Sequence, residues 1–187
     1  MRLTVVGCSG SVVGAHTPAS CYLLQSATHR PIIMDIGNGS MGGLQDLVDP
    51  SDCDLVLSHM HPDHIADISS LIVWRRYSHK STNTPATVLG PSTFLEKVGE
   101  WFADDYGTRH DLTDTFDFHP WDLAAPQSLG GFTFQAFRAD HPGEAYCMRV
   151  KEDSTGATFC FSGDTGPANG IHSASAGVDV FLCEATW

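Results

Sequence analysis

The stretch DLVLSHMHPDH, residues 54–64, decides the fold because it places four potential metal ligands directly after an apolar strand pattern. In an extended loop, side chains two residues apart point the same way, so the first two ligands can bind one cation. The last two follow a bend at a proline and can face a second cation. Such a cluster at the end of one strand indicates a two-metal site. The four ligands are His59, His61, Asp63 and His64.

Two later polar residues occupy the same kind of position. His141 follows the predicted strand 132–139, and Asp164 follows the predicted strand 157–161. Because strand ends converge at one edge of a sheet, we expect both side chains near the histidine cluster. His141 would complete a set of three histidines, and the carboxylate of Asp164 would bridge two cations.

The signature HxHxDH, followed by a later histidine and then by Gly-Asp, resembles that of the metallo-β-lactamase fold superfamily of hydrolases. Further motifs resemble the ribonuclease Z-like branch of phosphodiesterases, whose arm-less members include cyclic-nucleotide phosphodiesterases. The resemblance extends over nearly the whole chain and is more specific for the fold than for the substrate. The further motifs are Gly7-Cys8-Ser9-Gly10-Ser11, Asp35-x-Gly37-x-Gly39, Ser162-Gly163-Asp164-Thr165 and Glu184-Ala185-Thr186.

The resemblance implies an α/β fold, the αββα sandwich, with residues 1–187 forming a single hydrolase domain. It also implies two divalent metal ions, with zinc as the first expectation and manganese or iron as alternatives that the same nitrogen and oxygen ligands accept. One ion would bind His59, His61 and His141, and the other would bind Asp63, His64 and a further histidine, with Asp164 bridging the two.

Two catalytic roles follow from the same resemblance. Asp63 would accept a proton from the attacking water, which the two ions activate. Glu184 would orient a proton donor, although Cys183 stands where the ribonuclease-like pattern has a histidine. The last histidine ligand, with the closing strand and helix of the second half, is expected beyond Trp187. We therefore expect the domain to be incomplete at its C-terminus.

Local patterns predict strands and a smaller number of helices. The interval 104–117 collects five aspartates and is predicted to be a solvated acidic loop. Helices are predicted from about residue 91 to 102, after His64 as far as Trp74, and over 41–48. Strands are predicted at 3–7, 21–25, 31–35, 54–58, 86–90, 132–139, 146–151, 157–161 and 178–183.

Composition limits the partners and the compartment. Ten Lys and Arg against 22 Asp and Glu give a net charge of −12, which disfavours binding to nucleic acid. Six cysteines are spread singly, which indicates buried free thiols in a reducing compartment. Neither a signal peptide nor a long apolar run is evident, so we expect a cytoplasmic protein with no membrane partner. The resemblance leaves a homodimer open.

The same metal signature serves several hydrolases. Bacterial ribonuclease Z inserts a long RNA-binding arm between the counterparts of His141 and Asp164, whereas only 22 residues separate these two here. A small phosphodiester such as a 3′,5′-cyclic nucleotide is therefore the favoured substrate. The alternatives are a tRNA 3′-end endonuclease and a glyoxalase II-like thioester hydrolase. β-Lactam hydrolysis ranks last, because the main β-lactamase subclass has a cysteine at the position of Asp164.

A different class of function rests on residues 37–42, GNGSMG, which match the G-x-G-x-x-G pattern of dinucleotide-binding modules. The motif lies after the third predicted strand, and no acidic residue follows at the expected offset. The Asp35-x-Gly37-x-Gly39 motif explains the same glycines, so we rank this non-enzymatic function below hydrolysis.

Overall fold

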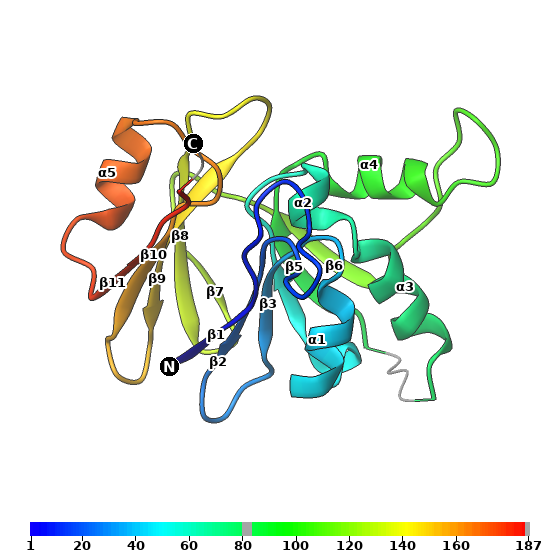
Figure 1. Ribbon diagram of the computed structural model, residues 1–187, viewed down its shortest axis with the longest axis horizontal. Helices are drawn as coiled ribbons and strands as arrows, with labels where there is room; N and C mark the ends of the chain where they lie inside the picture. Colours follow the sequence, from blue (N-terminus) through cyan, green and yellow to red (C-terminus); the bar gives the residue numbers. More distant parts are fainter. Residues whose placement is uncertain (80–83, 186–187) are drawn as a thin grey trace.

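Two β-sheets stack face to face, and helices cover both outer faces (Figure 1). This computed structural model describes residues 1–79 and 84–185. Thr186 of the predicted closing motif lies outside the described residues. The layers confirm the predicted α/β class and the αββα sandwich.

The first sheet has six strands and the second has five. The first contains, in order, β1 (Arg2–Gly7), β2 (Cys21–Gln25), β3 (Ile32–Ile36), β4 (Asp54–Val56), β5 (Ala86–Gly90) and β6 (Phe116–Pro120). The second contains, in order, β11 (Val180–Leu182), β10 (Thr158–Phe161), β9 (Tyr146–Glu152), β8 (Phe132–Arg138) and β7 (Gln127–Leu129).

The helices lie in the connections between strands. None among the described residues is long and apolar enough to cross a bilayer. They are α1 (Ser40–Leu47), the 3₁₀-helix η1 (Pro50–Asp52), α2 (Pro62–Ile65), α3 (Ile68–Tyr77), α4 (Phe94–Trp101) and α5 (Asn169–Ser175).

Strand side chains alternate between two cores because successive residues point to opposite faces of a sheet. In β3, Ile33 packs into the core beneath α1, α3 and α4, whereas Ile32 and Met34 pack into the core between the sheets. Phe132 and Phe134 of β8 fill that inter-sheet core from the other side. On the far face, α5 covers the second sheet.

The parallel strands bring the predicted ligands together. Strands β3, β4, β5 and β6 pair in parallel, as do β10 and β11. Their carboxyl ends therefore lead into loops at one end of the sandwich. The loop after β4 carries the HMHPDH motif, and the loop after β10 carries Asp164.

The structure corrects several local predictions. The helix predicted after His64 is two helices, because α2 ends at Ile65 and α3 begins at Ile68. Strands β6 and β7 and helix α5 were not predicted. The acidic interval 104–117 is not a loop throughout, since Leu112 and Phe116 are buried and Phe116 begins β6.

Candidate metal centre

The HMHPDH loop connects β4 to α2 and changes conformation at Pro62. His61 is extended, with φ −77° and ψ 150°, and precedes the first turn of α2. Proline at that first position has no N–H to satisfy and has a φ suited to the helix. The side chains of His59 and His61 therefore project from an extended segment, whereas those of Asp63 and His64 project from a helical turn. The backbone conformation thus differs between the two pairs of ligands.

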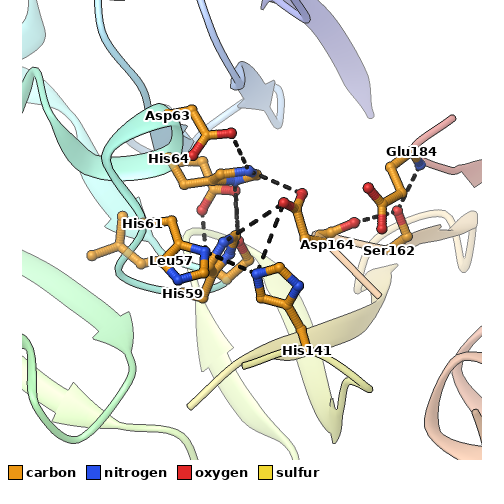
Figure 2. Close-up of polar contacts among 12 residues, drawn as sticks. Leu57, His59, His61, Asp63, His64, His141, Ser162, Asp164 and Glu184 are labelled. Atoms are coloured by element: carbon orange, nitrogen blue, oxygen red, sulfur yellow. Dashed lines mark hydrogen bonds and ion pairs between the residues drawn. The ribbon is translucent and has the colours of Figure 1, made fainter. Parts of the chain in front are cut away.

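One group of ligands comes from both sheets. His59, His61 and His141 each offer a ring nitrogen, and these atoms lie within 4.8 Å of one another. Nε2 of His141 is 2.9 Å from Nδ1 of His61 (Figure 2). The structure thus brings together the three histidines that the resemblance implied for one ion.

A second group shares His59 with the first. Its other members are His64 and Asp164, again with ligand atoms within 4.8 Å. Oδ1 of Asp164 is 3.0 Å from Nε2 of His64, and Oδ2 is 3.9 Å from Nε2 of His59. Oδ2 also lies 4.0 Å from Nε2 of His141, so this carboxylate stands between the two groups (Figure 2).

Asp63 lies beside the second group rather than within it. Its Oδ2 is 3.6 Å from Nε2 of His64, and its side chain lines the neighbouring cleft. A carboxylate in this place can either complete a ligand set or accept a proton from a group bound in the cleft.

The state of His59 suits a bound cation. Its side chain is 2% exposed, and its Nε2 has no hydrogen-bond partner among the residues that the structure describes. Burial of an unpartnered polar nitrogen is costly, and a cation would remove that cost. Burial, with the nearby charge of His64, lowers the pKa of His59 to about 3. A lowered pKa favours the neutral ring, which is the form in which histidine binds a metal. The clustered nitrogen and carboxylate donors fit divalent zinc, manganese or iron.

Asp35 is the residue whose role the sequence did not show. It is fully buried and has a positive φ of 53°, which is uncommon outside glycine. Its Oδ2 is 2.7 Å from Nδ1 of His64 and accepts a hydrogen bond from the hydroxyl of Ser58, while Oδ1 accepts one from the Ser58 N–H. The Asp35-x-Gly37-x-Gly39 motif contains this aspartate but gives no indication of its partner.

This contact fixes the orientation of His64. With Nδ1 directed at Asp35, Nε2 is directed at Asp164, the arrangement in which a carboxylate orients a metal-binding histidine. Burial alone would lower the pKa of His64, but Asp35 and Asp164 together raise it to about 10. The two carboxylates therefore give this end of the site a strong attraction for positive charge.

The first glycine of the GNGSMG motif has a structural explanation. A Cβ on Gly37 would lie 2.0 Å from the backbone oxygen of Asp63, so only glycine allows β3 to approach the ligand loop. The N–H of Met41, at the start of α1, donates to the carboxylate of Asp67. The helix end that would receive a dinucleotide phosphate is thus occupied by a side chain.

Glu184 supports the loop that carries Asp164. Its carboxylate accepts a hydrogen bond from the N–H of Thr165, and its own N–H donates to the hydroxyl of Ser162 at 2.8 Å (Figure 2). The predicted orientation of a proton donor by Glu184 stays a prediction.

A cleft of about 640 Å³ opens beside the second group. The Cys8–Ser11 loop and the segment after β11 line it, as do Asp63, His64 and Asp164. Cys8 and Cys183 both line it and are exposed, so the prediction of buried thiols is wrong for these two. They lie in connecting loops rather than inside strands, whereas the other four cysteines are buried.

Comparison with known proteins gives relatives along the whole chain. A protein of Mycobacterium tuberculosis strain H37Rv, described as uncharacterized, is 41% identical over 187 residues, covering 100% of this chain and 68% of that protein. A ribonuclease Z of Mycobacterium sp. strain KMS is 24% identical over 205 residues, covering 97% of this chain and 67% of the relative.

Solved structures show the same fold. The metallo-beta-lactamase fold protein YhfI of Bacillus subtilis aligns with a TM-score of 0.80 at 24% identity, over 96% of this chain and 69% of that one. The short form of human tRNase Z aligns with a TM-score of 0.74 at 19% identity, over 100% of this chain and 78% of that one.

The family itself is shown by sequence. A model of the beta-lactamase superfamily domain matches residues 41–187, which include His59, His61, Asp63, His64, His141 and Asp164. Together with the 41% identical relative, this match establishes the assignment. The chain belongs to the beta-lactamase superfamily and is a metal-dependent hydrolase of the metallo-β-lactamase fold.

Proposed function

We propose that this chain hydrolyses a small phosphodiester, such as a 3′,5′-cyclic nucleotide, with two divalent cations as cofactors. The observation that carries the proposal is the pair of ligand groups that share His59 and have Asp164 between them. The first group would hold one cation, and the second would hold the other together with Asp63. When bound, such cations lower the pKa of water and stabilise charge that develops on phosphoryl oxygens.

The protein groups then have separate roles. Asp63 lies at the boundary between the ligands and the cleft, so it would accept the proton of the attacking water. Asp35 would keep His64 in one tautomer, and Glu184 would hold the Asp164 loop while a donor protonates the leaving oxygen.

The preference for a small substrate rests on the segment between His141 and Asp164. The described residues 142–163 contain β9, a turn and β10, and thus no protruding arm. In the described part of the chain, the cleft lining contains Asp63, Asp164 and Glu184 but no Lys or Arg. With a net charge of −12, this surface favours a compact substrate with one negative charge over an RNA backbone.

The test is hydrolysis of 3′,5′-cyclic AMP by the full chain loaded with zinc or manganese. Bis(p-nitrophenyl) phosphate serves as a generic phosphodiester and S-lactoylglutathione as a thioester. We expect turnover of the two phosphodiesters and none of the thioester. Asp63→Asn should lower kcat by about 10²- to 10⁴-fold, the usual contribution of a general base, and its metal content is measured alongside.

The other outcomes separate the alternatives. Thioester turnover alone would replace the proposal with a glyoxalase II-like activity, and cleavage of a tRNA 3′ extension alone would replace it with an endonuclease. Wild-type activity in an Asp63→Asn chain that holds its cations would overturn the role of Asp63. We also propose that the protein is cytoplasmic, which cell fractionation tests. Homodimer formation is a further part of the proposal, and analytical sedimentation tests it.

A further inference from the structure

His141 differs from the other histidine ligands in where it comes from. His59 and His61 follow β4 of the first sheet, whereas His141 lies in the loop of residues 139–145, which joins β8 to β9 of the second sheet. A cation can bind all three only if the two sheets hold these histidines in the correct relative positions. Metal sites require such positions to within a fraction of an ångström.

The first half of this loop is attached to the neighbouring ligand loop. The N–H of Asp140 donates to the hydroxyl of Thr165 at 3.0 Å, and the N–H of Gly166 donates to the carbonyl of Asp140 at 2.8 Å. These bonds fix His141 relative to Asp164. Both partners belong to the second half of the chain, so they do not fix His141 relative to His61.

The second half of the loop crosses to the first sheet through one side chain. The carboxylate of Glu144 accepts hydrogen bonds from the N–H of Ser92 at 2.9 Å and from its hydroxyl at 2.8 Å. Ser92 lies between β5 and α4, 52 residues away in sequence. The hydroxyl of Tyr146 donates to the same carboxylate at 2.6 Å.

A backbone contact completes the attachment. The N–H of Tyr146 donates to the carbonyl of Ser58 at 3.1 Å, directly before His59. This bond joins the first residue of β9 to the ligand loop, but it does not involve residues 139–145. Glu144 extends the contact between the sheets into the loop itself.

We propose that Glu144 is a positioning residue, which holds the His141 loop against the first sheet so that His141 meets His59 and His61 around one cation. This inference rests on the proposed metal centre. It predicts that loss of the Glu144 acceptor oxygens weakens cation binding by the three-histidine group and leaves cation binding by His64 and Asp164 unchanged.

The experiment is a zinc titration of the full chain by calorimetry, after the metal has been removed with a chelator. Glu144→Ala removes all three acceptor contacts. Glu144→Gln keeps an oxygen for the Ser92 N–H and should restore binding. Asp179→Ala is the matched control, because Asp179 also accepts from a backbone N–H and a hydroxyl, those of Thr158, at the opposite end of β10. His141→Ala identifies which binding step belongs to the three-histidine group.

We expect Glu144→Ala to weaken the step that His141→Ala removes by about tenfold, in the range found for residues that orient metal ligands. The other step should be unchanged, and Glu144→Gln should bind within about threefold of wild type by the same reasoning. Thermal unfolding of the metal-free variants accounts for any general loss of stability.

Two results would overturn the inference. One is equal zinc affinity in Glu144→Ala and Asp179→Ala. The other is an equal loss at both steps, which would make Glu144 merely structural. Failure of the wild-type chain to bind zinc, manganese or iron would instead contradict the proposed function, so the two failures are distinguishable.

Discussion

Asp35 orients a candidate metal ligand although it belongs to neither ligand group. Its buried carboxylate orients His64 and also accepts from Ser58, the residue before His59. One side chain thus controls a ligand from each of the two pairs in the HMHPDH loop. This role requires a charged acceptor at that exact place.

Asp35→Asn should therefore weaken zinc binding by about 10- to 100-fold, because an amide directs an N–H rather than an acceptor at either Ser58 or His64. The measurement is competition for zinc against a chromophoric chelator. Asp67→Asn is the matched control, since Asp67 is also an acceptor in the same region but its partner is the N–H of Met41 at the start of α1. Equal affinity in the two variants would contradict the role of Asp35.

At the scale of elements, the ligand loop depends on how closely β3 passes beneath it. Gly37 follows β3 immediately, and its missing side chain leaves space that the backbone of Asp63 fills. The N–H of Ser20 donates to that same Asp63 carbonyl at 3.1 Å, which leaves the loop little room to move.

Gly37→Ala should destabilise the chain by about 1–3 kcal/mol, the usual cost of overpacking, and should also displace Asp63. Gly42→Ala is the control, because a Cβ at that helical position would meet nothing within 4 Å among the described residues outside its chain neighbours and its own helix backbone. That change should be neutral or stabilising by up to about 1 kcal/mol. Urea unfolding measures both, and equal stability of the two variants would contradict the close approach.

Much of the architecture could be predicted from sequence because its signals are local. The strands at 21–25 and 86–90 have the predicted bounds. Strand β7 was missed because it has only three residues and none is fully buried, and β6 was missed because aspartates precede it.

The ligand loop could be predicted because its four ligands are adjacent in sequence. The contacts that orient them could not. Asp35 and His64 are 29 residues apart, and Glu144 and Ser92 are 52 apart. A single carboxylate in a loop has no periodicity that would identify its partner, so these pairs emerge only when the sheets are assembled.

For the whole molecule, the two sheets meet at the ligand groups, so cation binding should join them. Zinc at 100 times its Kd should add about 2.7 kcal/mol to the free energy of unfolding and raise Tm by about 5–10 °C. Calcium, which prefers oxygen ligands, should have little effect. Differential scanning calorimetry with and without a chelator checks this, and an unchanged Tm with zinc bound would contradict it.

The most direct test of the shared two-cation centre is the metal content of the chain after loading with zinc and gel filtration. We predict two zinc ions per wild-type chain and the loss of both in His59→Ala, because His59 belongs to both ligand groups. His16→Ala, a change in an exposed loop histidine, should retain both ions. One ion or none in the wild type, or two ions retained by His59→Ala, would contradict the account.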